Sequence, residues 1–163
     1  MNIKNILIFF LTIFLSGAAF AQKVEIYNPD ADAKKEISQA IEKAAKEGKH
    51  VFLQIGGNWC PWCVKFHNFV DADAELKNYV EANYEVVKVN YDPEHKQEEL
   101  LSELGFPQRF GFPVFVILDS KGNRIHTQNS AYLEKDKSYD KDVVLRFFKS
   151  WSAAAINPSS YKK

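Results

Sequence analysis

The chain has very few cysteines: its 163 residues include two, Cys60 and Cys63. Because only two residues separate them, a bond between them cannot join distant parts of a fold, which excludes a disulfide-stapled scaffold. In an oxidising compartment, a vicinal pair of this kind favours redox chemistry over a structural role.

The sequence also lacks the further ligands that a metal or haem site requires. His67 follows Cys63 by four residues, but no second cluster of zinc ligands accompanies the pair. A c-type haem site needs a histidine directly after the second cysteine, where Val64 stands. We therefore expect a protein that works without a metal or an organic cofactor.

The sequence also has no surplus of positive or negative charge. Lysine and arginine together total 21, and aspartate and glutamate together also total 21. Attraction to nucleic acid or to an anionic membrane depends on a surplus of positive charge. We therefore expect no nucleic-acid partner.

No hydrophobic run is long enough to cross a membrane. The apolar stretch from Ile6 to Phe20 has 15 residues, whereas a spanning helix requires roughly 20. Lys4 precedes this stretch and Ala19-Phe20-Ala21 ends it, as is typical of a secretory signal peptide. We expect residues 1–21 to be cleaved before Gln22, giving a periplasmic or secreted protein without stable membrane insertion.

Residues 22–163 are enough for one ordinary domain and too few for two well-filled cores. Hydrophobic periodicity, capping residues and turn residues predict its elements. The first is a helix capped by Asp30 or Asp32, which carries Ile37, Ala40, Ile41 and Ala44 and ends at Gly48. In chain order there follow a buried strand at 51–55, a helix from Cys60 through Phe66, a helix capped by Asp71 or Asp73, a strand at 84–91, a helix at 94–104, a strand at 113–118, a hairpin strand at 124–127 and a helix capped by Asp140 or Asp142. The charged run at 134–140 is expected to be a solvated loop, and the residues from Trp151 onward are expected to fray. This order predicts an α/β fold in which helices cover both faces of a central mixed β-sheet.

The cysteine pair falls at the junction between the first strand and the next helix. Pro61 suits the first helical turn, where its missing N–H is not needed. The free N–H groups and the positive dipole end of that helix favour a thiolate on Cys60, which makes Cys60 the better nucleophile. Cys63, one turn later, can then attack the resulting mixed disulfide and release the substrate.

Two segments resemble the active-site region of thioredoxin-fold proteins. One is GNWCPWCVK at residues 57–65, and the other is Gly111-Phe112-Pro113-Val114. The resemblance is strongest to small exported thioredoxin-like or disulfide-isomerase-like bacterial proteins, and it covers roughly residues 49–151. It implies a thioredoxin fold with a cis Pro113 beside the cysteines, where the Phe112 backbone can pair with an extended substrate. Trp59 and Trp62, aromatic residues beside a reactive cysteine, are expected to add to this substrate surface.

Two departures from the family pattern bear on the mechanism. Thioredoxins usually place a buried carboxylate six residues before the first cysteine, but Gln54 stands there and cannot act as a base. By the resemblance, Lys88 points towards Gln54 and the cysteines, so these two residues are expected to form the proton-transfer environment. The Pro61-Trp62 pair between the cysteines offers no cation, and it leaves the direction of electron flow open.

The sequence therefore predicts a thiol–disulfide oxidoreductase that acts on protein disulfides through Cys60 and Cys63. We favour the reductase or isomerase direction over the oxidase direction. The expected partners are client proteins with disulfides or thiols and an upstream thiol that donates or accepts electrons. The alternative is a thioredoxin-fold binding module or holdase whose cysteines do not turn over.

Overall fold

The computed structural model of the chain describes residues 25–162, and the expected signal peptide lies outside them. The elements are α1 (Ala33–Glu47), β1 (His50–Gly56), α2 (Pro61–Ala72), α3 (Ala74–Asn83), β2 (Tyr84–Asn90), α4 (Glu98–Glu103), β3 (Val114–Leu118), β4 (Arg124–Asn129), β5 (Glu134–Lys135), β6 (Ser138–Tyr139), α5 (Lys141–Ser150) and α6 (Ala153–Ile156), with three short 3-10 helices, η1 (Pro107–Phe110), η2 (Ser130–Leu133) and η3 (Pro158–Tyr161). No helix within residues 25–162 is long and apolar enough to cross a membrane.

The four-stranded central sheet has the order β2-β1-β3-β4. β1 runs parallel to β2 and antiparallel to β3, and β4 pairs antiparallel with β3, so the sheet is mixed as predicted. Every residue of β1 and of β3 is buried, because these two strands lie at the centre of the sheet. In the register, Gln54 of β1 lies beside Lys88 of β2 and Phe115 of β3.

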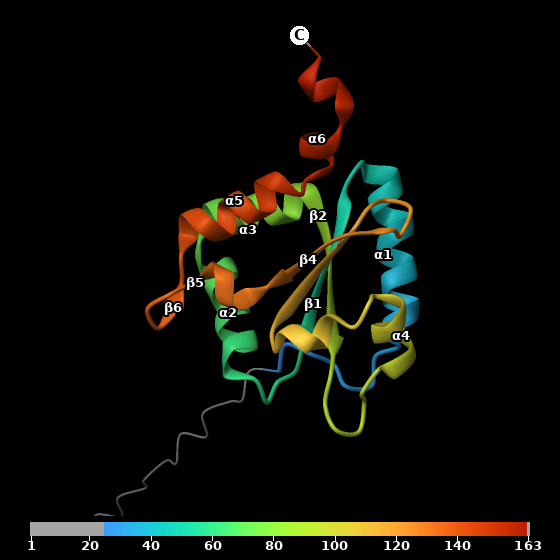
Figure 1. Ribbon diagram of the computed structural model, residues 1–163, viewed down its shortest axis with the longest axis vertical. Helices are drawn as coiled ribbons and strands as arrows, with labels where there is room; N and C mark the ends of the chain where they lie inside the picture. Colours follow the sequence, from blue (N-terminus) through green and yellow to red (C-terminus); the bar gives the residue numbers. More distant parts are fainter. Residues whose placement is uncertain (1–24, 163) are drawn as a thin grey trace, which may run out of the picture.

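Helices cover both faces of the sheet (Figure 1). α1 and α4 pack on one face over an aliphatic cluster, and α2, α3 and α5 pack on the other over an aromatic one. Phe52 of β1 lies near the middle of the aromatic cluster, with its ring centroid 5.1 Å from that of Phe148 and 5.3 Å from that of Phe115. Burying each such side chain stabilises the fold by about 1.5–3 kcal/mol.

The first helix follows its sequence signals closely. Asp32 is the N-cap of α1, and its side chain accepts the Lys35 N–H at 3.0 Å. Gly48 ends the helix in the left-handed conformation, with φ at 68°, and its N–H bonds the Ala44 carbonyl. Asp73 and Asp140 cap α3 and α5 in the same way as Asp32, so one of the two candidates named for each helix is correct.

The helix expected at 94–104 is shorter than predicted and begins at Glu98. The Asp92 carboxylate accepts the N–H groups of Glu94 and His95, which holds this part of the chain in a turn. Gln97 then takes a left-handed conformation with φ at 52°. A side chain that bonds its own following backbone competes with helix formation, which explains the difference.

Two expectations near the C-terminus were wrong. The run expected as a solvated loop does expose Lys135, Asp136 and Lys137, but it forms the β5–β6 hairpin, which the buried Tyr139 anchors to the aromatic cluster. The residues after Trp151 form α6 and η3 instead of fraying, since Ser152 caps α6 through the Ala155 N–H. Figure 1 shows α6 projecting from the body of the molecule.

Candidate active site

The cysteines form a disulfide at the start of α2, with their Cα atoms 5.2 Å apart. β1 ends at Gly56, a short turn follows, and Pro61 occupies the first helical turn as the sequence predicts. Cys60 is the N-cap, and its Sγ accepts the Cys63 N–H at 3.2 Å. Cys60 is 4 % exposed and Cys63 is fully buried. The backbone N–H groups of α2 therefore point at Cys60, which favours negative charge on its sulfur.

Gly56 lets β1 approach the second cysteine closely. A Cβ at this position would collide with the Cys63 Sγ and would lie 3.1 Å from the Tyr27 hydroxyl. The absence of a side chain therefore makes room for the sulfur. Gln54, two residues earlier on the same face of β1, lies next to this contact.

Gln54 is 2 % exposed and is held by two hydrogen bonds. Its Nε2 donates to the Cys63 carbonyl at 3.0 Å and to the Tyr27 hydroxyl at 2.8 Å. The side chain therefore touches the backbone of Cys63, the second cysteine of the pair. An amide cannot take up a proton, so Gln54 can orient Cys63 but cannot deprotonate it.

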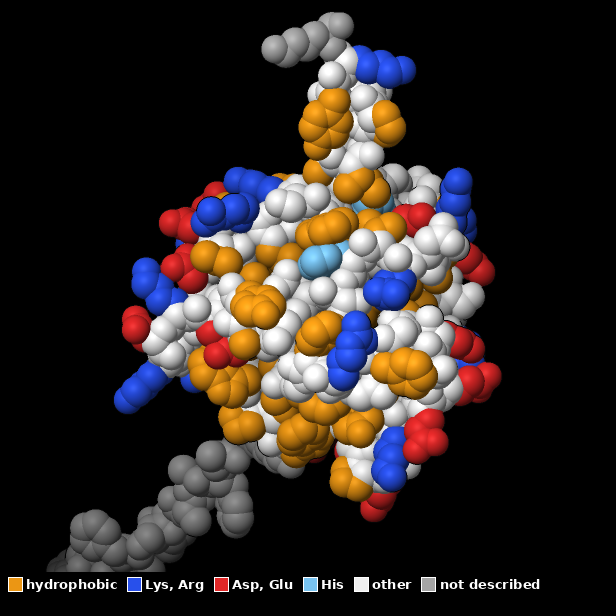
Figure 2. All heavy atoms as spheres, in the orientation of Figure 1, with side chains coloured by type: hydrophobic (Ala, Val, Ile, Leu, Met, Phe, Trp, Pro, Cys, Tyr) orange, Lys and Arg blue, Asp and Glu red, His pale blue; other side chains and the backbone are white. Residues whose placement is uncertain are grey.

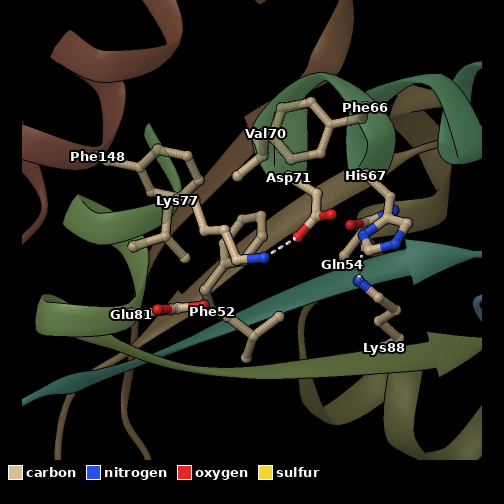
Figure 3. Close-up of a pocket in the computed structure, with 12 residues that line it drawn as sticks. Phe52, Gln54, Phe66, His67, Val70, Asp71, Lys77, Glu81, Lys88 and Phe148 are labelled. Carbon is tan, nitrogen blue, oxygen red and sulfur yellow. Dashed lines mark hydrogen bonds and ion pairs between the residues drawn. The ribbon is translucent and has the colours of Figure 1, made fainter. Parts of the chain in front are cut away.

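Lys88 does not bond Gln54, although the two residues are neighbours in the β1–β2 register. Its Nζ lies 3.2 Å from Nδ1 of His67 in α2. Burial lowers the pKa of Lys88, and burial followed by the nearby Lys88 ammonium lowers the pKa of His67. Figure 3 shows these two side chains pointing towards each other beside Gln54. All three border a cavity of about 120 Å³ between the sheet, α2 and α3.

Aromatic side chains surround the mouth of the site. Trp59 is 52 % exposed, its Nε1 donates to the Tyr91 carbonyl at 2.7 Å, and its ring meets Phe112 edge-on at 5.6 Å. Phe112 in turn stacks on Tyr91 and packs against the cysteines. The Phe112–Pro113 peptide bond is cis, which confirms that expectation. In Figure 2, hydrophobic side chains gather at the lower end of the molecule, which is the end where β1 leads into α2 in Figure 1.

The Trp62 side chain is less exposed than that of Trp59. It is half-buried, its ring meets Tyr139 edge-on at 5.5 Å, and the Lys65 ammonium lies 4.2 Å from its ring centroid. The Tyr139 hydroxyl donates to the Trp62 carbonyl at 3.2 Å. The side chain thus packs against Tyr139, Lys65 and the cysteine cluster and remains partly exposed.

Three residues of the site escaped the sequence reasoning: Tyr27, Asn58 and Tyr139. The Asn58 Oδ1 accepts the N–H groups of Ile26 and Tyr27, and its Nδ2 donates to the Tyr27 carbonyl at 2.8 Å. These hydrogen bonds position Tyr27, whose hydroxyl accepts the hydrogen bond from Gln54. Burial raises the pKa of Tyr27 and of Tyr139, so both hydroxyls stay protonated. No local pattern indicated contacts between residues so distant in the chain.

The described part of the chain contains no group of three or more histidine, cysteine, aspartate or glutamate side chains that could hold a metal ion.

Comparisons with known proteins agree on the fold. A family model described as thioredoxin-like matches residues 32–120. The disulfide bond reductase DsbH of Chlamydia pneumoniae is 25% identical over 113 residues, which cover 62% of this chain and 68% of the relative. A disulphide isomerase from Xylella fastidiosa Temecula1 superimposes with a TM-score of 0.69 at 23% identity, over 78% of this chain and 96% of that one. A DsbH oxidoreductase gives a TM-score of 0.51 at 19% identity, over 74% and 82% of the two chains.

Proposed function

The chain belongs to the thioredoxin-like family, and from this premise we propose that it is a thiol–disulfide oxidoreductase that reduces or isomerises disulfides in client proteins. The observation that carries the proposal is the Cys60–Cys63 bond at the N-terminus of α2. The Phe112 side chain, next to a cis Pro113, packs against this pair. A vicinal dithiol in this position has an activated first sulfur and a second sulfur within its reach.

In the reducing direction, the Cys60 thiolate bonds to one sulfur of the client disulfide. The other client sulfur leaves as a thiolate and takes a proton from solvent. Cys63 then loses its proton and attacks the Cys60 sulfur, which breaks the Cys60–client bond and forms the Cys60–Cys63 bond. The client gains two electrons, and an upstream donor with two thiols, which are oxidised to a disulfide, returns the pair to the dithiol. Electrons pass only between sulfurs, so this cycle needs no metal or organic cofactor.

Isomerisation uses the same first step. A thiolate of the client then displaces Cys60 in place of Cys63, and no net electron transfer occurs. The relative named above is a reductase and the structural neighbour is an isomerase, which supports these directions for the present chain. A strongly oxidising pair depends on stabilisation of its reduced form, and Pro61-Trp62 supplies no charge for this.

We assign client binding to the aromatic surface at the mouth of the site, formed by Trp59, Trp62, Phe112 and Pro113. Aromatic rings provide contact area that tolerates many sequences. Gly111 is exposed and Phe112 is half-buried at this edge of the site, and here we place an extended client peptide alongside the disulfide. This arrangement suits a protein that selects unfolded or partly folded clients.

Reduction of insulin tests the proposed function. The wild-type protein, supplied with a thiol reductant, is expected to accelerate precipitation of the insulin B chain, whereas Cys60→Ser should lose this activity. Equal rates for both proteins would contradict the proposal. If neither protein reduced insulin, and Cys60→Ser protected an unfolded client against aggregation as well as the wild type does, the chain would be a binding module.

Export is the second part of the proposal. The arrangement of Lys4, the apolar stretch that follows and Ala19-Phe20-Ala21 supports cleavage before Gln22. Mass spectrometry of the protein purified from its native host should find a mature N-terminus at Gln22. An intact Met1 would show that residues 1–21 are retained.

A further inference from the structure

The resolving cysteine has no obvious acceptor for its proton. Cys63 is fully buried, and burial disfavours the thiolate that must attack the mixed disulfide. The Gln54 side chain bonds the Cys63 carbonyl but cannot accept a proton. Gln54 is therefore not the acceptor of this proton.

Gln54 also lines the cavity described above, which Cys63 does not border. With a volume of about 120 Å³ the cavity has room for several water molecules, because one water needs about 10–15 Å³ of such space. Gln54, His67 and Lys88 supply polar groups on one side of it (Figure 3). Water in this space can link the Gln54 side chain to the paired nitrogens of His67 and Lys88.

His67 and Lys88 form one coupled basic group. Their nitrogens are 3.2 Å apart, so a full positive charge on both is unfavourable. Burial and the Lys88 ammonium hold the pKa of His67 below its ordinary 6.5. At neutral pH the imidazole is therefore uncharged, and the Lys88 ammonium beside it makes an added proton short-lived, so the pair can receive a proton and pass it on to solvent.

The surrounding charges suit a transient gain of a proton. Asp71 on α2 and Glu81 on α3 bring two carboxylates to the cavity, and Lys77 on α3 joins Lys88 as a second ammonium. Asp71 and Lys77 form an ion pair at 2.6 Å. With neutral His67 these charges balance, and a proton arriving from Cys63 leaves one positive charge opposite one thiolate.

We propose that the His67–Lys88 pair, through water in the cavity beside Gln54, accepts the proton that Cys63 releases when it resolves the mixed disulfide. This inference rests on the proposed function. The S–H bond of Cys63 breaks, its electron pair stays on sulfur, and the proton joins the pair. The thiolate then bonds to Cys60 and the client sulfur leaves; the pair returns its proton to solvent. Neither side chain touches the sulfurs, so both act through Gln54 and water.

The test separates the two steps of exchange by stopped flow. The reduced protein is mixed with an aromatic disulfide that releases one coloured thiolate when Cys60 attacks and a second when Cys63 resolves. His67→Gln keeps a hydrogen-bond acceptor for Lys88 but cannot hold a proton at these pH values. Near pH 7 we expect it to slow the second phase by roughly 10-fold, to move its pH profile upward and to leave the first phase unchanged. His126→Gln, on β4, is the matched control and should behave as wild type.

Chemical rescue keeps the test decisive if His67→Gln packs poorly. In His67→Ala, added imidazole should restore the second phase and its pH profile, which a packing defect would not allow. An unchanged second phase in His67→Gln, or no rescue of His67→Ala by imidazole, would overturn the inference. Loss of insulin reduction by the wild type would instead contradict the proposed function, because the two-phase reaction is measured without a protein client.

Discussion

Cys63→Ser is expected to accumulate mixed disulfides with client proteins, whereas Cys60→Ser should accumulate few. Cys60 caps α2 and receives the Cys63 N–H, so it is the sulfur that the helix activates. Cys63 is fully buried, so we expect it to act only after Cys60 has bound a client. Without Cys63 the covalent complex has no internal means of release, and we expect roughly 10-fold or more trapped client relative to Cys60→Ser.

Non-reducing gels of the two variants, expressed in the native compartment, measure this difference. The double variant Cys60→Ser with Cys63→Ser is the control for adventitious cross-links. Both single variants should lose catalytic turnover, because each lacks one partner of the exchange. Equal trapping by the two single variants would mean that the helix N-terminus does not decide which sulfur attacks first.

Gln54→Asp is expected to speed the resolving step and to lower stability. A carboxylate beside Cys63 is a base in the place where thioredoxins usually carry one, and general-base assistance of this kind is worth roughly 100-fold. The new carboxylate also loses the donor that now bonds the Cys63 carbonyl. An unpaired buried carbonyl and a buried charge together should cost about 2–4 kcal/mol.

The loss of stability should depend on pH in a defined direction. Burial raises the pKa of the new carboxyl in the folded protein above its unfolded value of about 3.9. Between these two values the folded state binds more protons than the unfolded state, so the free energy of unfolding falls as pH rises. The destabilisation is therefore smallest below about pH 4 and complete above the folded-state pKa.

Urea unfolding at several pH values, together with stopped-flow measurement of the resolving step, checks both expectations. Gln54→Asn is the matched control, because it has the same size as the aspartate variant without its acid. A resolving rate and pH profile identical in Gln54→Asp and Gln54→Asn would show that this position does not take part in proton transfer. A pH-independent difference in stability would show that the carboxyl is not buried.

Local signals in the sequence account for most of the fold and for the sulfur pair. The apolar spacing of α1 and its caps at Asp32 and Gly48 involve neighbours in the chain, so they can be read directly. The Cys60–Cys63 spacing and Pro61 likewise specify a strand-to-helix junction. By contrast, the Asp92 turn shortened α4 because its carboxylate bonds the following backbone, which periodicity alone does not reveal.

The finer features of the site depend on contacts between distant segments. Lys88 was expected to face Gln54, and its ammonium instead bonds His67, because β2 and α2 both face the cavity. Tyr27 and Tyr139 reach the cysteine region from opposite ends of the domain. Side chains that meet only through tertiary packing leave no pattern in a single sequence.

The two tyrosines also matter for the exchange of segments between this chain and a relative. The stretch shared with the family, residues 32–120, carries both cysteines and Pro113 but neither Tyr27 nor Tyr139. Yet one hydroxyl braces the amide under Cys63 and the other braces the backbone of Trp62. If residues 32–120 of this chain were moved into a relative, the sulfurs would move with them, but these two tyrosines would stay behind. The sulfur pair is thus supported by residues outside the stretch that the family model matches.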